Sequence, residues 1–232
     1  MENLFYVPAE KIDPTIPIEI EGQEARHISR VLRFKEGDRI HIADGSGKIY
    51  YCDIQSVNTG SVTARISEIR SLNQPDIKKV LAMGVVKKRD RLEFAVEKAV
   101  ELGAWEICLF EADHSERSRV KMERIESIVL SAFKQSKRSW LPAVRFMGSL
   151  DEVLDHYKDH HPLMASMDTD PERPTDLKNK KNLLLVGPEG GFSDREIELV
   201  IKKNATLLSL GKNRLRAETA VTAILSQFLY SD

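Results

Sequence analysis

A strand, a glycine-rich turn and a helix follow one another over residues 183–200 (LLLVGPEGGFSDREIELV), and this order constrains the fold more than any other stretch. The four apolar residues at 183–186 have the length of a short buried strand. The turn GPEGG follows, and Ser193 and Glu196 have the S-x-x-E spacing of a capping box that begins a helix. Such a junction leaves free backbone N–H groups at the end of a sheet, where α/β proteins bind ligands.

The composition of this turn limits the ligand that it can hold. Glu189 places a negative charge in the turn, and no G-K-[ST] follows to hold phosphates or magnesium, so a polyphosphate is disfavoured. A nucleoside-like ligand without phosphates suits the turn better. Glycine turns also occur in loops that bind nothing, so the turn alone does not establish a site.

A second strand–loop–helix unit follows the first. Residues 205–210 (ATLLSL) read as a short strand that ends at Gly211, and the polar loop 212–216 (KNRLR) leads into a helix from Ala217. The apolar positions of this helix recur with the 3.6-residue period of an amphipathic helix. They are residues 217, 220, 221, 224, 225, 228 and 229.

The first 72 residues have a different pattern. Short β-like runs separated by glycine turns predict a small barrel, interrupted by a helix at 24–32. The predicted strands are 4–7, 39–43, 49–57 and 61–69. The polar, Pro-containing stretch 71–79 is the expected boundary between a domain at 1–72 and a domain at 73–232.

After this boundary, strands and helices alternate, which predicts an α/β domain with a mostly parallel sheet. The predicted strands are 80–86, 105–110, 144–147 and 163–167, ahead of the two C-terminal units. The predicted helices between them are 90–102, 121–137 and 150–158.

Composition restricts the partners and the compartment. The net charge of −1 gives no overall positive field, so an RNA-binding surface must be gathered into local patches. Cys52 and Cys108 lie far apart, which indicates buried thiols in a reducing compartment. The N-terminus lacks a secretory pattern, and no run approaches the roughly 18 apolar residues of a membrane span. We therefore expect a cytoplasmic protein that does not enter a membrane.

The histidines and Ser193 invite other chemistries. His156, His160 and His161 cluster at a helix end, but no acidic or cysteine partner has ligand spacing, so solvated histidines and no metal site are expected. No G-x-S-x-G is present, and capping explains Ser193 without a nucleophilic role.

Basic residues gather in several clusters that would suit an RNA surface. Three lie on the helix at 24–32 or directly after it, and the others follow strands or flank helices of the second domain. Each cluster alone reads equally well as a solvated face. The candidates are Arg26, Arg30, Arg33, Lys88, Arg91, Arg117 and Arg138.

Several of these motifs together resemble one family. GPEGGFS and LGKNRLRAETA, in this order near the C-terminus, are similar to the signature of the bacterial small-subunit (16S) ribosomal RNA uridine N3-methyltransferases, members of the SPOUT class. The segments AxHIxRVLRxxxGDxI and DGxGxxY, KKRDRLEFAVEKAVELG, SERS at 115–118 and AFKQSKRSWLP at 132–142 extend the resemblance. One departure is Lys134, where relatives tend to carry Glu, so a role of that acid does not transfer.

The resemblance implies a SPOUT-type α/β domain with a C-terminal trefoil knot, preceded by a PUA-like RNA-binding barrel. It also implies S-adenosyl-L-methionine as the cofactor, no metal, a homodimer, and 16S ribosomal RNA of the small subunit as the partner. RNA contact by the basic clusters then becomes the favoured interpretation. The implied cofactor-binding residues are Ser166, Gly187, Pro188, Glu189, Gly190, Gly191, Leu210, Gly211, Leu215, Arg216, Glu218, Thr219 and Ala220.

The implied substrate defines the catalytic candidates. N3 of uracil carries a proton at neutral pH, so Arg216 is the preferred residue for stabilising negative charge on the base. Glu189 is a candidate for proton removal or for pairing with the sulfonium, or a carboxylate that ties down its own turn. Glu218 equally suits a first-turn helix charge.

Two alternatives remain at this point. One is a SPOUT enzyme that modifies a different nucleotide or atom. The other is a non-catalytic RNA-binding or ribosome-assembly protein, or a nucleotide-binding α/β module.

Overall fold

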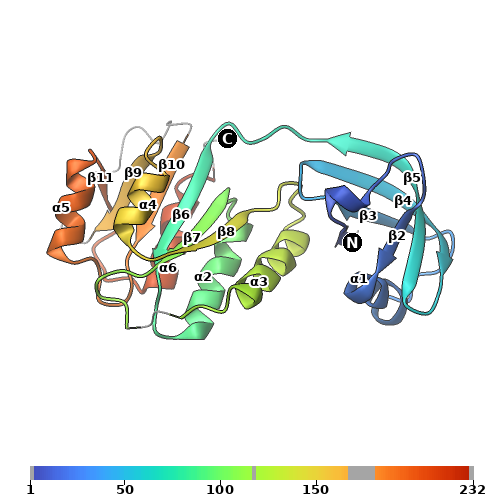
Figure 1. Ribbon diagram of the computed structural model, residues 1–232, viewed down its shortest axis with the longest axis horizontal. Helices are drawn as coiled ribbons and strands as arrows, with labels where there is room; N and C mark the ends of the chain where they lie inside the picture. Colours follow the sequence, from blue (N-terminus) through green and yellow to red (C-terminus); the bar gives the residue numbers. More distant parts are fainter. Residues whose placement is uncertain (1–2, 117–118, 167–180, 230–232) are drawn as a thin grey trace. The chain divides into compact units, whose positions relative to one another are not determined.

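The computed structural model describes residues 3–116, 119–166 and 181–229, and the chain forms two compact units (Figure 1). The first unit combines Met1–Gln74 with the later segment Phe133–Leu141, and the second contains the rest of the chain.

The first unit is built on a five-stranded sheet with the order β1-β3-β4-β5-β2. β1 runs parallel to β3, and the other pairs are antiparallel. Two register shifts between β4 and β5 mark bulges, which increase the local twist of the sheet. The strands are β1 (Leu4–Tyr6), β2 (Ile18–Glu21), β3 (Arg39–Ala43), β4 (Lys48–Val57) and β5 (Ser61–Ser71), and a short helical turn η1 (Ala9–Lys11) follows β1.

Strand β2 was not predicted from the sequence. Ile18 and Ile20 are buried and the two glutamates between and after them are exposed, which is the alternation of a half-buried strand. Only four residues separate Pro17 from Gly22, so the run is too short to be recognised as a strand without its partner β5.

The predicted helix at 24–32 begins earlier and changes its pitch. It consists of α1 (Gly22–Arg26) followed by a π-helical turn, η2 (His27–Val31). The backbone N–H of Leu32 donates to the carbonyl of His27 at 3.0 Å, the i→i+5 bond that defines such a turn. Buried Ile28 anchors this turn in the core of the first unit.

The DGSGKIY segment folds around one buried carboxylate. Asp44 accepts from the backbone N–H of Ser46 at 2.7 Å and of Lys48 at 3.2 Å, and from the hydroxyl of Tyr50 at 3.2 Å. Burial, with the adjacent Asp44 charge, raises the pKa of Tyr50 to about 12. The motif is therefore a structural turn, because its acid is fully engaged by its own loop.

The segment Phe133–Leu141 crosses this turn. The backbone N–H of Gly47 donates to the carbonyl of Ser139, and that of Leu141 donates to Gly45, each at 3.0 Å. Gly47 has φ +95°, and a Cβ built there would lie 2.3 Å from the ring of Trp140. Only glycine permits this close approach of indole and backbone.

Lys134, which departs from the family pattern, also lies in this segment. Its ammonium pairs with Glu24 in a largely buried contact, with 22% and 15% of the two side chains exposed. In this chain Lys134 therefore completes an ion pair inside the first unit.

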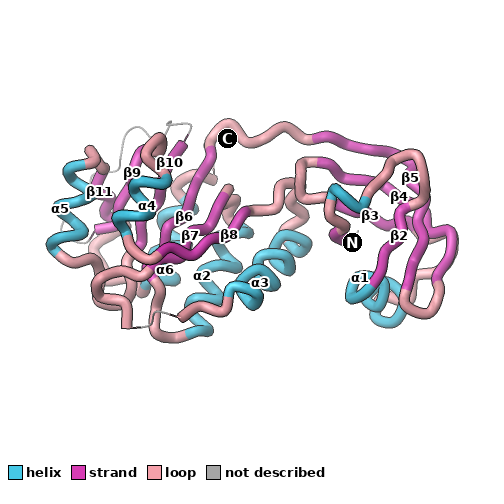
Figure 2. Tube along the Cα trace, in the orientation of Figure 1, coloured by secondary structure: helices cyan, strands magenta, loops and turns pink. Residues whose placement is uncertain are grey.

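The second unit has a six-stranded parallel sheet with the order β11-β9-β10-β6-β7-β8 (Figure 2). The predicted α/β class and parallel sheet are confirmed. The strands are β6 (Lys78–Gly84), β7 (Glu106–Phe110), β8 (Ala143–Met147), β9 (His161–Ser166), β10 (Lys181–Val186) and β11 (Thr206–Ser209). The helices are α2 (Arg89–Glu101), α3 (Met122–Gln135), α4 (Leu150–His156), α5 (Asp194–Lys202) and α6 (Ala217–Ser226).

Both faces of the central strands are buried. On β10, Leu183 and Leu185 belong to the core that contains α4 and α5 residues, while α6 packs against β10, β6 and α2. All strands run in one direction, so the carboxyl ends of β9, β10 and β11 meet at one edge of the sheet.

Candidate functional site

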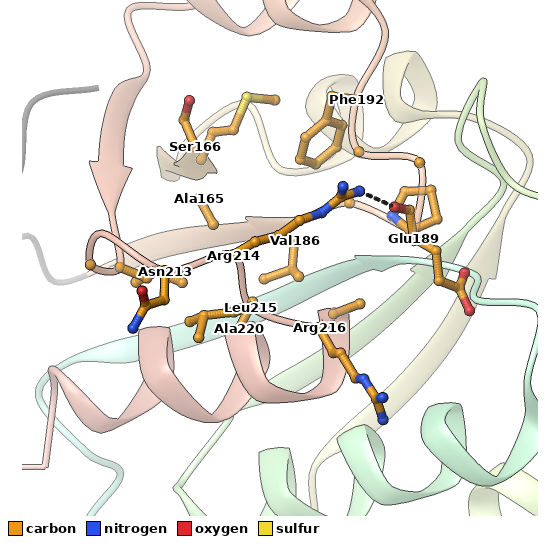
Figure 3. A pocket seen from close by; sticks show the side chains of 18 of the residues that line it. Ala165, Ser166, Val186, Glu189, Phe192, Asn213, Arg214, Leu215, Arg216 and Ala220 are labelled. Atoms are coloured by element: carbon orange, nitrogen blue, oxygen red, sulfur yellow. Dashed lines mark hydrogen bonds between the residues drawn. The ribbon is translucent and has the colours of Figure 1, made fainter. Parts of the chain in front are cut away.

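A pocket of about 670 Å³ lies at the carboxyl ends of β9, β10 and β11 (Figure 3). It is formed by the end of β9, the glycine turn after β10, and the loop between β11 and α6. Its volume is that of sites for small organic ligands. The lining residues are Met164, Ala165, Ser166, Val186, Gly187, Pro188, Glu189, Gly190, Gly191, Phe192, Ile197, Leu210, Gly211, Asn213, Arg214, Leu215, Arg216, Ala217 and Ala220.

The structure brings eleven of the thirteen expected cofactor-binding residues to this pocket, and Glu218 and Thr219 are not among its lining residues. Glu218 instead faces Arg91, with 3.6 Å between carboxylate and guanidinium. It sits in the first turn of α6, where a negative charge is also favoured by the helix dipole.

The start of α5 holds the glycine turn in place. The predicted capping box is present: the Ser193 hydroxyl accepts from the backbone N–H of Glu196 at 3.2 Å, and the Glu196 carboxylate accepts from the backbone N–H of Ser193 at 2.9 Å. Gly191 closes the turn at φ +73°, and its N–H donates to the carbonyl of Pro188 at 2.9 Å. The turn is therefore held by one backbone hydrogen bond within it and by the capping box that follows it.

A neighbouring loop after β7 is clamped to α5. The guanidinium of Arg195 binds Asp113 at 3.0 Å and Asp151 at 2.8 Å, and the buried carboxylate of Glu196 accepts from the backbone N–H of Asp113 at 3.2 Å. Hydrogen bonds from Arg195 and Ser193 lower the pKa of Asp113 to about 2. This clamp positions the loop that carries His114.

Replacing Asp113 with asparagine should therefore lower the melting temperature by a few degrees near neutral pH. The folded-state pKa lies below the value of about 4 for an unfolded aspartate, so the stabilisation is present above pH ~4 and is lost as the pH falls through ~2. The pair is partly exposed, so screening keeps the effect small. Thermal unfolding at pH 6 and at pH 2.5 tests this: an equal difference at both values would contradict the ionic role.

Gly190 faces this loop. A Cβ built at Gly190 would lie 2.9 Å from the Cβ of His114, and His114 Nδ1 lies 3.2 Å from the carbonyl oxygen of Gly190. Gly190 does not have positive φ. Gly190 is therefore required because the His114 Cβ leaves no room for a side chain, and not because its backbone conformation is strained.

The carboxylate of Glu189 is directed away from the pocket (Figure 3). It accepts from the backbone N–H of Lys87 at 3.2 Å, at the junction between β6 and α2. Glu189 therefore lines the pocket edge as a residue, while its carboxylate links the glycine turn to the loop between β6 and α2.

Arg214 lines the pocket, although no sequence motif singled it out. Its side chain extends across the pocket between Val186 and Phe192, and its guanidinium donates to the carbonyl of Glu189 at 3.3 Å (Figure 3). Arg216 occupies the N-cap position of α6 and points away from Arg214 (Figure 3). The loop KNRLR contains two arginines, and nothing in the sequence indicates which of them points into the pocket.

The expected RNA-binding residues have different environments. Arg26, Arg30 and Arg33 are exposed in the first unit, and Lys88 is exposed at the N-cap of α2. Arg91 faces Glu218 as described above, and Arg117 lies outside the described residues. Arg138 is half-buried, and burial lowers its pKa to about 10.

The histidine cluster is not fully solvated, contrary to expectation. His160 is half-buried, and burial lowers its pKa, while His161 Nε2 lies 2.9 Å from the hydroxyl of Thr206. Within residues 3–116, 119–166 and 181–229, no group of three or more His, Cys, Asp or Glu side chains could hold a metal ion. Cys52 and Cys108 are buried free thiols, and burial raises the pKa of each to about 12.

None of the helices in the described part of the chain is long and apolar enough to cross a membrane.

The fold and the pocket define a two-unit α/β protein with a nucleoside-sized pocket at the carboxyl ends of parallel strands. A model of the RNA methyltransferase domain matches residues 73–229, and a model of the RNA methyltransferase PUA domain matches residues 20–67. The chain therefore belongs to the RNA methyltransferase family, with a SPOUT-type domain and a PUA-like domain, as the sequence motifs predicted.

Relatives of known name cover almost the whole chain. The ribosomal RNA small subunit methyltransferase E of Bacillus subtilis is 29% identical, with 95% of this chain and 93% of that protein covered. The protein of the same name from Synechocystis is 30% identical, with coverage of 97% and 76%.

Solved structures agree with this. The Neisseria gonorrhoeae ribosomal RNA small subunit methyltransferase E bound to S-adenosyl methionine has a TM-score of 0.88 at 26% identity, covering 98% of this chain and 97% of that one. A Legionella pneumophila putative methyltransferase in complex with the same cofactor has a TM-score of 0.89 at 28% identity, covering 100% and 98%.

Proposed function

We propose that this chain uses S-adenosyl-L-methionine to methylate N3 of a uridine in the ribosomal RNA of the small subunit. The observation that carries the proposal is the pocket at the ends of β9, β10 and β11, in a chain whose full-length relatives are named for this RNA and whose structural neighbours hold this cofactor.

The lining of the pocket fits the cofactor. Apolar side chains such as Met164, Val186 and Phe192 suit an adenine ring, and the turn and the loop after β11 present backbone polar groups for the edge of the base. A Cβ at Gly191 or Gly211 would meet no atom within 4 Å, so both loops leave open space around these glycines. When bound, the cofactor supplies an electrophilic methyl group.

For methyl transfer, the protein must position the uracil, remove the proton from N3 and stabilise the negative charge that this leaves on the base. N3 lies on the Watson–Crick edge, so the base must be unpaired or extruded before it reaches the pocket. Arg216 is our candidate for stabilising negative charge on the uracil oxygens as N3 loses its proton. Its guanidinium is exposed and directed away from Arg214, which leaves it available at the rim.

Glu189 remains a candidate for proton removal. The hydrogen bond that it accepts from the Lys87 backbone, however, directs the carboxylate out of the pocket. We therefore place Glu189 second to Arg216 in the catalytic assignment.

The first unit would hold the RNA, and the second would carry out the transfer. A homodimer follows from family likeness, and the cytoplasm is the expected location because ribosomal RNA of the small subunit is the proposed substrate. Arg26, Arg30 and Arg33 form our main candidate RNA surface on the first unit, since all three are exposed around α1 and η2.

Combining Arg30→Ala with Arg33→Ala should weaken binding of small-subunit ribosomal RNA without changing affinity for S-adenosylmethionine. The pair supplies exposed cations for phosphate contacts, and loss of two such contacts should also reduce the salt dependence of RNA binding. Filter binding over a salt series, with calorimetry for the cofactor, checks both parts. Arg39→Ala, which removes an exposed arginine paired with Asp53, is the matched control. A joint loss of both affinities would contradict the division between the units.

The function itself is tested by mass-mapping ribosomal RNA from cells that lack the protein. We expect one uridine of the small-subunit RNA to lose a methyl group, and the purified protein with S-adenosylmethionine to restore it at N3. Methylation at another atom or nucleotide would identify a SPOUT enzyme of different specificity. Binding of ATP but not of S-adenosylmethionine would support a nucleotide-binding module instead.

A further inference from the structure

Among the residues that the structure describes, Arg214 crosses the pocket without a carboxylate partner. Within the described parts of the chain, its one hydrogen-bond acceptor is the carbonyl of Glu189, at 3.3 Å. A guanidinium has five N–H donors in a planar fork that matches a carboxylate, so most of its capacity is unused. The side chain is exposed, which leaves that capacity open to a ligand.

The other charged groups of the pocket point elsewhere. The lining contains three charged side chains, those of Glu189, Arg214 and Arg216. The Glu189 carboxylate turns outward to the backbone N–H of Lys87, and the Arg216 guanidinium points away from Arg214 (Figure 3). Arg214 alone of the three crosses the cavity, so the charge offered to a ligand inside it is positive.

This charge restricts how the proposed cofactor can lie. S-adenosylmethionine has two cationic groups, the sulfonium and the ammonium, and one anionic group, the carboxylate of its methionine tail. A fixed guanidinium repels the first two and pairs with the third. The orientation that brings the carboxylate to Arg214 is therefore favoured.

We propose that Arg214 is the specificity-determining residue for the cofactor's tail, and that it binds the tail carboxylate with the N–H groups that the Glu189 carbonyl does not use. The inference rests on the proposed use of S-adenosylmethionine. The carbonyl of Glu189 holds the guanidinium in its inward position before binding, which reduces the side-chain ordering that binding would otherwise require.

The test compares two ligands that differ only in this carboxylate, S-adenosylmethionine and decarboxylated S-adenosylmethionine. Calorimetric titration of the wild-type chain should show about a tenfold preference for the first, since one exposed charge-assisted contact has this magnitude. Arg214→Met should lose the preference by weakening S-adenosylmethionine binding alone. Unchanged affinity for the decarboxylated ligand shows that the pocket of the variant is folded.

Lys212→Met is the matched control, because it removes an exposed cation from the same loop at a residue that does not line the pocket. It should retain the wild-type preference. Arg214→Lys should keep a reduced preference, since an ammonium pairs with a carboxylate without the planar fork.

Three results would overturn the assignment of Arg214. These are a preference that survives in Arg214→Met, an equal loss of affinity for both ligands, and a variant whose only defect is in RNA binding. The second would make Arg214 a structural brace of the turn, and the third an RNA contact. Failure of the wild-type chain to bind either ligand would instead reject the proposed function and is distinguishable from all three.

Discussion

Arg216→Ala should lose about a hundredfold in the rate of a single turnover while still binding S-adenosylmethionine. A fixed positive charge beside the uracil lowers the cost of forming the N3 anion, and loss of such an interaction typically costs about 3 kcal/mol where the bound RNA excludes water from the site. Arginine stays protonated at any working pH, so its contribution is electrostatic and not that of a base. Cofactor binding should persist because the guanidinium points away from the residue that crosses the pocket.

The pH dependence separates this role from a structural one. Raising the pH should partly rescue Arg216→Ala, because more of the uracil then ionises without help. Arg216→Lys should recover part of the activity, since a compact ammonium supplies the charge but not the planar fork. Single-turnover methylation across a pH series measures both effects. Normal rates in Arg216→Ala, or a loss confined to cofactor affinity, would make Arg216 a pocket residue without a catalytic role.

Gly190→Val should lower affinity for S-adenosylmethionine at least tenfold. The added Cβ would lie 2.9 Å from the Cβ of His114, and rotation about χ1 does not move a Cβ. Valine also adds two methyl groups at this crowded atom. The turn must then shift away from the loop after β7, and Gly187 and Gly191 shift with it. Overpacking of this kind costs roughly 1–3 kcal/mol, so the variant should still fold.

A second substitution identifies the cause of that loss. Gly190→Val combined with His114→Gly removes the opposing Cβ and should restore much of the cofactor affinity, as measured by calorimetry. A defect that persists in the double variant would mean that the valine itself occupies ligand space. Unchanged affinity in Gly190→Val alone would remove the glycine turn from the site.

The local elements of the second unit were predictable because their determinants lie close in sequence. The capping box needs only Ser193 and Glu196, and the strands β10 and β6 are runs of apolar residues that are buried on both faces. The position of the pocket at one edge of the sheet was also predictable, because parallel strands bring their carboxyl ends together. The list of cofactor-binding residues came from the family resemblance, and eleven of its thirteen members line that pocket.

Features that depend on distant residues or on loop conformation were not predictable. The direction of Arg214 and Arg216 is set by how the chain leaves β11 and enters α6, and both arginines look alike in the sequence. The clash that requires Gly190 comes from His114, 76 residues earlier. Likewise, β2 becomes a strand only through its pairing with β5.

The composition of the first unit has a consequence for the order in which the chain can fold during synthesis. Its turn at Gly45–Gly47 is completed by Ser139, Trp140 and Leu141, which leave the ribosome only after β6, α2, β7 and α3 have been made. N-terminal domains commonly fold first as they emerge. Here the DGSG turn stays uncovered until residues 139–141, which follow α3, have been translated. A chain truncated near residue 74 would therefore keep the apolar core of the first unit but lack the segment Phe133–Leu141 that covers this turn.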